Sequence, residues 1–280
     1  MTVQYPDVDW TPSLSRNGCV LRERGEGELL FLFDGMQGSG EASMELIVPV
    51  AERLAAAGRP QRVILFDYAA EQHATFDELV ETARSLVQER CAGQPCTFWA
   101  QSFGTLIATA PRLARSVAVR RFVLVSGFSM LAQLKALLAT LLLAVTPTWL
   151  YRLTIAPMGR WLFGPPGDQP RHPFFAALAR GTSPTARRRT SWLRRRSFAA
   201  QFADTPAPTR VWLGAHDRLI RLGEERAFFA AQAGRRADYE LTMMPDCGHL
   251  VLPSRCFPPV WQQLFDWLAS DAPEAQRAAP

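Results

Sequence analysis

Ser102 is the residue of this chain whose surroundings best suit it for covalent chemistry. It follows a strand-forming run, Thr97 to Trp99, and an apolar run of helical character, Phe103 to Ala108, begins directly after it. The small residues Ala100 and Gly104 flank it two positions away on either side. A serine on a sharp strand-to-helix turn has strained backbone geometry, and small neighbours let the strand and the helix approach closely. The pattern favours a nucleophile on such a turn, and an ordinary turn capped by the serine is the alternative.

The five residues from Ala100 to Gly104 resemble the G-x-S-x-G nucleophile elbow of the α/β hydrolases, with alanine in place of the first glycine. In that family an acidic residue and then a histidine follow the serine along the chain, each at the end of a strand. Asp217 and His249 stand in this order after two strand-like runs, in segments similar to the acid and histidine loops of the family. Each alone is also typical of a helix cap or a loop residue. Together the resemblance implies a catalytic triad of Ser102, His249 and Asp217.

A glycine-rich loop, Asp34 to Gly40, lies between an apolar strand-like run and a predicted helix. Phosphate-binding loops occupy the same place, but the chain has neither G-x-x-x-x-G-K-[ST] nor a complete G-x-G-x-x-G here. In the α/β hydrolases this loop supplies one backbone N–H of the oxyanion hole, and the residue after the nucleophile supplies the other. The resemblance therefore implies an oxyanion hole formed by Gly35 and Met36 on the loop and by Phe103 after the serine.

The loop departs from the His-Gly pair that is commonest in the family, because Phe33-Asp34-Gly35 stands in its place. It more closely resembles the P-G-x-D-G-x-G loop of a set of bacterial serine hydrolases and of the esterase/lipase/thioesterase domains of plant phytyl ester synthases. In that set the elbow often reads A-E-S-F. This likeness implies acyl esters or thioesters of apolar groups as substrates. Asp34 either caps the turn or faces the substrate pocket, for which Gln101 is a second candidate.

Strand-like and helix-like runs alternate along most of the chain. The predicted strands are Cys19–Glu23, Leu29–Phe33, Arg62–Tyr68, Thr97–Ala100, Arg120–Val125, Thr209–Gly214 and Tyr239–Met244, and helices are predicted over about 42–57, 75–91, 103–116 and 260–268. This rhythm predicts an α/β fold with a mostly parallel, doubly wound sheet. Ligands of such sheets bind at the carboxyl ends of the strands, which is where Ser102, Asp217 and His249 fall.

The alternation stops between Gly127 and Thr209, where helices rich in leucine and alanine are predicted over about 130–153, 157–162, 173–180 and 184–202. By resemblance this segment is a helical cap inserted after the sixth strand, which divides the chain into a core (1–127 and 205–280) and a cap (128–204). Its uncharged run, 136–151, is shorter than the ~20 residues that span a bilayer. A helix apolar on most sides buries two faces. Leu141 and Leu150 are therefore expected to line an apolar substrate pocket, with packing inside the cap as the alternative.

The net charge of +5 is unevenly distributed. Between Gly127 and Asp204 there are eleven basic and two acidic residues, a balance of +9, whereas the rest of the chain carries −4. The densest basic run, Arg187 to Arg196, is interpreted as a solvated helix face with Trp192 and Leu193 turned inward, and binding to nucleic acid or to an anionic membrane surface is the alternative. No nucleic-acid module accompanies it. The expected partner is a small molecule, with no nucleic acid, no transmembrane span and at most weak contact with a membrane surface; the oligomeric state is open.

The cysteines (Cys19, Cys91, Cys96, Cys247 and Cys256) are odd in number and lack the spacing of a metal site, so they are interpreted as reduced thiols. The first ten residues have neither the basic nor the apolar region of a secretory signal. Both observations predict a cytoplasmic protein. No metal and no organic cofactor is implied.

The chemistry predicted from these residues is acyl transfer to water, in which a carboxylic ester or thioester with an apolar acyl or alcohol group is cleaved. A C–C bond hydrolase, or an acyltransferase or cyclase of a biosynthetic pathway, would use the same three residues. From another class, a non-catalytic binding protein could be built on a hydrolase scaffold. A binding protein has no need of a complete serine, histidine and aspartate set, which favours the enzyme.

Overall fold

The strands form one sheet in the computed structural model, which describes residues 10–40, 44–131, 133–162, 182–194, 196–251 and 258–270. Within these residues the sheet has eight strands, in the order β1-β2-β4-β3-β5-β6-β7-β8. The strands are β1 (Thr11–Arg16), β2 (Cys19–Arg24), β3 (Glu28–Phe33), β4 (Gln61–Asp67), β5 (Cys96–Gln101), β6 (Val119–Val125), β7 (Thr209–Gly214) and β8 (Tyr239–Met244). The helices are α1 (Met44–Ala56), α2 (Phe76–Cys91), α3 (Phe103–Ala108), α4 (Pro111–Ala114), α5 (Gln133–Val145), α6 (Thr148–Leu162), α8 (Ser183–Leu193), α9 (Ala199–Ala203), α10 (Leu222–Arg235) and α12 (Pro258–Ala269).

The sheet is parallel from β4 to β8, and β1 and β2 are added at one edge in antiparallel pairing. The central strands are apolar throughout because helices cover both faces of the sheet. Phe33 at the end of β3 pairs with Ala100 near the end of β5, and Gly214 at the end of β7 pairs with Met244 at the end of β8. The register therefore brings the loops that follow these strands to one edge of the sheet.

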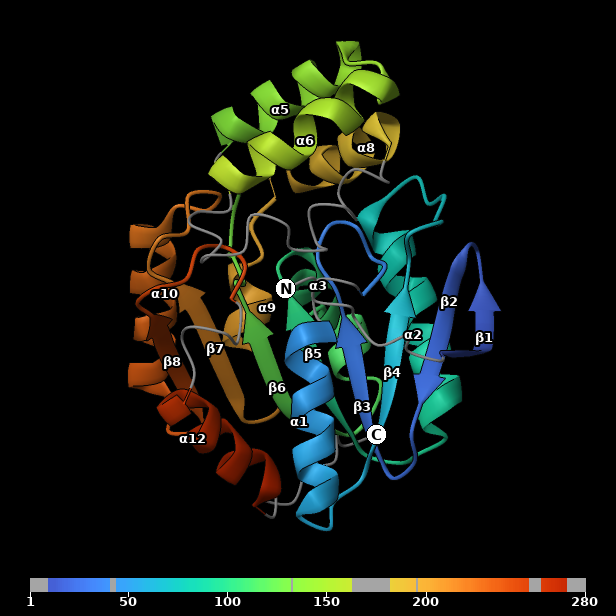
Figure 1. Ribbon diagram of the computed structural model, residues 1–280, viewed down its shortest axis with the longest axis vertical. Coiled ribbons are helices and arrows are strands. Elements are labelled where there is room, and N and C mark those ends of the chain that lie inside the picture. The colour runs from blue at the N-terminus through green and yellow to red at the C-terminus, as the bar shows by residue number, and fades with distance from the viewer. Residues whose placement is uncertain are drawn as a thin grey trace, which may run out of the picture.

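The molecule is layered, with helices on the two faces of the sheet (Figure 1). Helices α1 and α12 cover one face, where Trp99 and Trp212 meet edge to face at 6.1 Å. Helices α2, α3, α4, α9 and α10 contribute to the hydrophobic cluster on the other face, whose centre is aromatic. There Phe98 lies between Phe33 and Phe122, at ring separations of 5.1 and 5.6 Å. The doubly wound α/β fold predicted from the sequence is confirmed.

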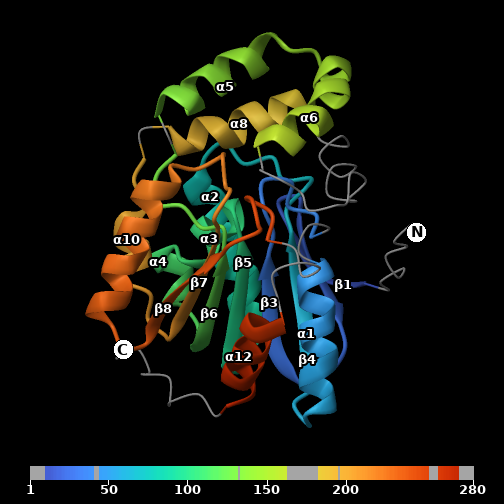
Figure 2. The same cartoon turned by 60° about the vertical axis from the view of Figure 1, so that its left-hand side comes forward.

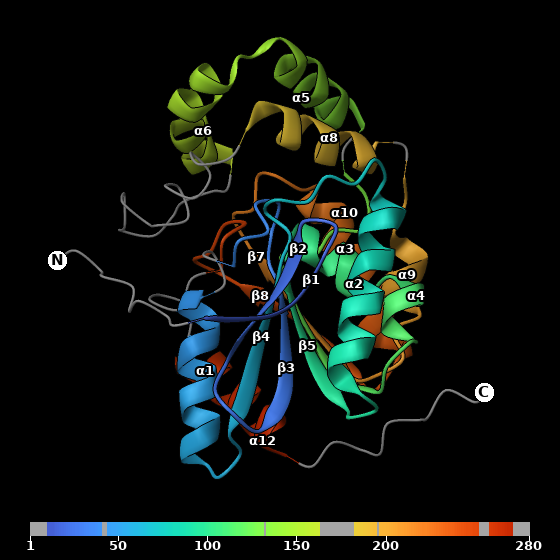
Figure 3. The same ribbon diagram turned by 90° about the vertical axis from the view of Figure 1, so that its right-hand side faces the viewer.

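Three helices, α5, α6 and α8, lie beyond the carboxyl ends of the strands (Figure 2); we call them the overlying helices. Figure 2 and Figure 3 both show α8 between α5 and the sheet. The chain leaves and re-enters the body at neighbouring points, because the N–H of Phe198 donates to the carbonyl of Ser129 at 2.7 Å. The buried carboxylate of Glu225 on α10 accepts from the N–H groups of Ser129 and Met130, at 2.7 and 3.2 Å. The base of the overlying helices is thus tied to the body.

The seven predicted strands are present, each within a residue or two of its expected ends, whereas several helices differ. The helix expected over 103–116 is two helices, because Pro111 has no N–H to continue α3 and instead begins α4. The helix expected over 184–202 is likewise divided into α8 and α9, and α9 packs on the body through Phe202. The strand β1 and the helix α10 were not predicted. The helix expected over 173–180 lies outside the described residues.

The cysteines differ from the expectation of uniformly reduced thiols. Cys19, Cys91 and Cys96 are buried and free, as expected, whereas Cys247 is disulfide-bonded. Cys256 lies outside the described residues. The interpretation as a reduced thiol was therefore wrong for Cys247, because spacing along the chain does not reveal which sulfur atoms folding brings together. The cytoplasmic location, which rested partly on that reading, stays a prediction. Among the described residues no helix is long and apolar enough to cross a membrane.

Candidate active site

Ser102 stands on the turn between β5 and α3, with φ 51° and ψ −120°. Its N–H donates to the carbonyl of Val125 at the end of β6, at 2.8 Å. The close approach of α3 to β3 explains why Gly104 is a glycine. A Cβ at this position would overlap the carbonyl oxygens of Phe33 and Asp34. Sequence and backbone together therefore produce a sharp, strained turn that holds the serine at the carboxyl edge of the sheet.

A continuous chain of hydrogen bonds joins the three residues that the sequence singled out. Ser102 Oγ lies 2.7 Å from His249 Nε2, and His249 Nδ1 lies 2.6 Å from Asp217 Oδ2. The other carboxylate oxygen of Asp217 accepts from the N–H groups of Leu219 and Ile220, at 2.9 and 3.3 Å. His249 is 1% exposed and Asp217 is 5% exposed. A carboxylate held in this way can orient the imidazole, and the imidazole can take a proton from the hydroxyl.

The loops that carry Asp217 and His249 are fastened to each other. A Cβ on Gly214, at the end of β7, would overlap the carbonyl oxygen of Gly248, so the two loops touch through bare backbone. The N–H of His216 donates to the carbonyl of Cys247 at 2.9 Å. Ser126, a residue that the sequence reading missed, donates its hydroxyl to the carbonyl of His249 at 2.5 Å. Its only signal in the sequence is its place directly after β6.

The glycine-rich loop passes beside the serine. A Cβ on Gly35 would lie 3.6 Å from Ser102 Cβ, which is ordinary contact. The carboxylate of Asp34 accepts from the N–H of Gly40 at 2.9 Å, which matches the turn-capping role considered for Asp34. Within the described part of the chain, the backbone N–H groups of Met36 and Phe103 donate to no protein acceptor. Two backbone donors are therefore available, one on the glycine-rich loop and one directly after the serine.

Tyr68 and Arg189 hold the glycine-rich loop in place, and neither was predicted to do so. The Tyr68 hydroxyl lies 2.6 Å from the carbonyl oxygen of Asp34 and 2.5 Å from that of Gly35. Arg189, on α8, is 1% exposed, and its guanidinium donates to the carbonyl oxygens of Met36 and Tyr68. Its Nε also donates to the carboxylate of Glu71, at 3.0 Å. An overlying helix thus contacts the loop directly.

The arginine run forms the expected solvated helix face only in part: Leu193 is buried and Trp192 stacks on Phe103, as expected, but not all of the arginines face solvent. Arg188 pairs with Glu71 at 2.7 Å and Arg196 pairs with Asp77 at 2.7 Å, while Arg189 is fully inside the protein. The buried carboxylate of Glu71 compensates the buried guanidinium, which no local pattern on α8 could reveal. Burial acts to raise the pKa of Glu71, but the hydrogen bond from Arg188 and the charge of Arg189 outweigh it and hold the pKa below its usual value.

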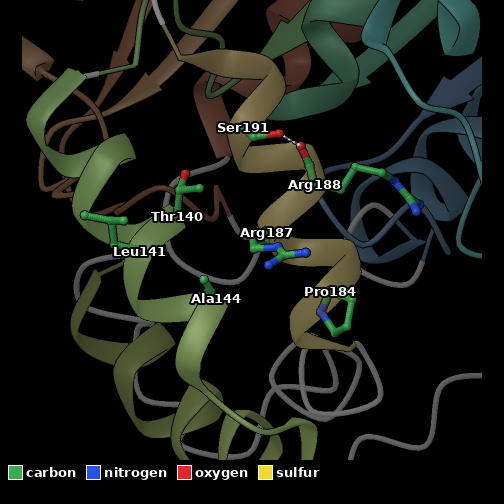
Figure 4. Close-up of a pocket in the computed structure, with 7 residues that line it drawn as sticks. All are labelled: Thr140, Leu141, Ala144, Pro184, Arg187, Arg188 and Ser191. Atoms are coloured by element: carbon green, nitrogen blue, oxygen red, sulfur yellow. Dashed lines mark hydrogen bonds between the residues drawn. The ribbon is translucent and has the colours of Figure 1, made fainter.

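The candidate pocket residues fall into two places: Asp34 and Gln101 follow the paired ends of β3 and β5, whereas Leu141 and Leu150 lie on the overlying helices. Gln101 is buried at the end of β5. Leu141 is exposed on α5 and lines a groove of about 470 Å³ between α5 and α8 (Figure 4). The groove is lined by Thr140, Leu141, Ala144, Pro184, Arg187, Arg188 and Ser191, and by none of Ser102, Asp217 and His249. Leu150 is 36% exposed on α6. Tyr151 of α6 is instead the buried one, hydrogen-bonded to Gln37 of the glycine-rich loop.

The described residues offer no cluster of three or more histidine, cysteine, aspartate or glutamate side chains arranged to hold a metal ion. The groups around Ser102 are an imidazole, a carboxylate and backbone N–H groups.

An eight-stranded, mostly parallel sheet that presents a serine on a strand-to-helix turn, with an aspartate and a histidine on later loops, is the architecture of the α/β hydrolases. The chain belongs to the alpha/beta hydrolase family, whose model matches residues 38–256. A search of curated proteins gives no significant match.

Solved structures of the same fold agree with this assignment. The chain is similar to a hydrolase from Pseudomonas aeruginosa (18% identity, 94% of this chain and 99% of that chain, TM-score 0.71). It is also similar to the enol-lactonase from Burkholderia xenovorans (15% identity, 91% and 98%, TM-score 0.69). A thermophilic esterase from Thermogutta terrifontis matches likewise (17% identity, 93% and 98%, TM-score 0.68). At these identities the likeness shows the fold.

Proposed function

We propose that the protein is a serine hydrolase that cleaves a carboxylic ester or thioester with an apolar acyl or alcohol group. The observation that carries the proposal is the chain of short hydrogen bonds from Ser102 through His249 to Asp217. Such a chain activates a hydroxyl that is a weak nucleophile on its own. The enol-lactonase and the esterase among the similar structures act on carboxylic esters by their names, which supports the bond type.

The hydrogen bonds among Ser102, His249 and Asp217 support the following course of reaction. Ser102 Oγ attacks the carbonyl carbon as His249 Nε2 takes the hydroxyl proton, and the N–H groups of Met36 and Phe103 stabilise the oxyanion. The tetrahedral intermediate collapses to an acyl-enzyme, and the imidazolium returns its proton to the departing alcohol or thiol. Water, deprotonated by His249, then attacks the acyl-enzyme, and the imidazolium returns this proton to Ser102 Oγ as the acid is released. Asp217 holds the imidazole in the required tautomer and stabilises its cationic form throughout.

The segment 128–204 is proposed as a cap over this site, with 1–127 and 205–280 as the core. The position of the overlying helices beyond the carboxyl edge of the sheet supports the assignment. An apolar substrate group is supported by the surroundings of the serine. Met36 packs against the hydrophobic cluster, and the Trp192 ring of α8 stacks on the Phe103 ring at 6.4 Å.

The test is hydrolysis of p-nitrophenyl esters from acetate to palmitate, with an acyl-thioester series, by the parent protein and by Ser102→Ala. We expect activity that rises with acyl length in the parent and is lost in the variant. Ser197→Ala, which removes an exposed serine outside the site, is the matched control and should retain activity. An inert parent whose Ser102 is still labelled by a fluorophosphonate would instead favour the C–C hydrolase, acyltransferase or cyclase alternatives. Absence of both reactions would contradict the proposal.

A further inference from the structure

Helix α5 turns a continuous apolar stripe toward solvent. Leu138, Leu141, Leu142 and Val145 follow one another at the i, i+3, i+4 and i+7 spacing, which places them on one face of the helix. Their side chains are between 54% and 79% exposed, whereas Ala136 on the opposite face is fully buried. A stripe with this spacing normally faces a protein core. Here the helix buries its other face against α8.

Helix α6 carries further exposed apolar residues. Trp149, Leu150 and Leu153 are exposed, at 64%, 36% and 66%, while Tyr151 on the other side of α6 is buried. In Figure 2 and Figure 3, α5 is the helix of the described chain that lies farthest from the sheet. We define the outer apolar face as Leu138, Leu141, Leu142, Val145, Trp149, Leu150 and Leu153. The stripe on α5 is continuous rather than scattered, and an exposed apolar surface of this kind marks a site of interaction with a protein or a membrane.

The charge around the outer apolar face selects between these partners. Helices α5, α6 and α8 contain no aspartate and no glutamate. Arg152 is exposed on α6, and Arg187 is exposed on the far side of the groove that Leu141 lines (Figure 4). Among the described residues Arg187 has no ion-pair partner. A second copy of the same face would bring like charges together, which disfavours a symmetric dimer through this surface.

We propose that the outer apolar face docks on the surface of an anionic lipid bilayer. In this arrangement the leucine side chains and Trp149 enter the boundary between headgroups and acyl chains, and the flanking arginines remain at the level of the phosphates. Helix α5 lies in the plane of the surface and does not cross it, since its 13 residues are too few to span the hydrocarbon. The docking uses no residue of the hydrolytic site, so Ser102→Ala should bind vesicles as the parent does.

The experiment is flotation of the full chain with vesicles of phosphatidylcholine alone and of phosphatidylcholine mixed equally with phosphatidylglycerol, at low and high salt. We expect binding to the anionic vesicles that weakens as salt rises. In the double variant Leu142→Glu/Val145→Glu the partition coefficient for anionic vesicles should fall at least about tenfold. In Arg187→Ala the same partition coefficient should fall about fivefold, because one basic residue near an anionic surface contributes about that factor to binding.

Ala230→Glu is the matched control, because it adds a negative charge to an exposed position of α10, away from the outer apolar face. It should bind as the parent does, and circular dichroism should give one folded spectrum for all variants. Three results would overturn the proposal. These are no flotation with anionic vesicles at low salt, equal binding to neutral and anionic vesicles, or a dimer of the parent that the double variant dissociates without any vesicle binding.

Discussion

At the scale of single residues, Ser102 depends on its neighbours more than on its own side chain. Its positive φ is a conformation that side chains rarely adopt, and such strain persists only where the surrounding structure holds it. Gly104 makes this possible, because a larger residue would push α3 away from Phe33 and Asp34. The same contact sets the position of the glycine-rich loop relative to the serine. The absence of a side chain at Gly104 thus determines the positions of both the serine turn and the glycine-rich loop.

Gly104→Ala should therefore damage both stability and activity. We expect the free energy of unfolding in urea to fall by about 1–3 kcal/mol, the usual cost of overpacking. We expect kcat/KM for a p-nitrophenyl ester to fall more than about tenfold, because the proposed donor on Met36 would be displaced from the oxyanion. Gly127→Ala is the control, since a Cβ there would make ordinary contacts of 3.5 and 3.6 Å. Equal losses in the two variants would contradict the argument.

At the scale of elements, α8 links the overlying helices to the site. Its Arg189 bonds to the carbonyl of Met36, and its Trp192 donates to the carbonyl of Ala74 at 2.9 Å while stacking on Phe103. The Met36 carbonyl and the Met36 N–H belong to adjacent peptide units, which meet at the Cα of this residue. A shift of α8 would therefore turn the proposed oxyanion donor. This makes Arg189 a positioning residue, acting through the backbone rather than on the substrate.

Arg189→Met retains the length of the side chain and removes its donors. We expect kcat to fall at least about tenfold with a smaller change in KM, because an oxyanion donor acts mainly in the transition state. Arg187→Met, on the same helix but exposed, is the matched control and should leave both constants unchanged. Arg189→Lys, which keeps the charge, should recover part of kcat. A rise in KM with kcat unchanged would show that Arg189 serves only to hold the helix.

The elements also show what sequence patterns can and cannot predict. The strands and the residues at their ends were predictable, because buried parallel strands are apolar throughout and their carboxyl ends meet at one edge. The burial of Arg189 was not, since its partner Glu71 lies far away in the sequence and the helix around Arg189 is polar. The sequence also did not allow us to predict that Leu141 faces solvent. A helix that is apolar on most sides carries no signal for which side is covered.

At the scale of the whole molecule, a buried ionic cluster joins the overlying helices to the body. Glu71 lies directly after β4 and its turn, and it pairs with both Arg188 and Arg189 of α8. Its carboxylate is fully buried, and it also accepts from the N–H of His73 at 2.8 Å. Removing one partner from such a cluster leaves an uncompensated buried charge. The stability of the molecule should therefore depend on the ionisation of one carboxyl group.

Burial acts to raise the pKa of Glu71, but the bond from Arg188 and the charge of Arg189 hold it below the ordinary value of 4.5. A carboxylate with a lowered pKa contributes stability that is complete above that ordinary value and is lost as the pH falls through the folded-state pKa. Glu71→Gln should be less stable than the parent by about 3 kcal/mol at neutral pH. The difference should narrow below pH 4.5, where the parent loses the same contribution.

Urea unfolding of the parent and of Glu71→Gln, from neutral pH into the acid range, measures this difference directly. Glu240→Gln is the matched control, because Glu240 pairs with Arg210 at the surface and such pairs contribute at most about 1 kcal/mol. A difference between parent and Glu71→Gln that stays constant as the pH falls would mean that the carboxylate is not ionised in the folded protein. Arg189 would then be held by the backbone carbonyls of Met36 and Tyr68 and Arg188 by that of Glu71, and acid would not loosen the overlying helices.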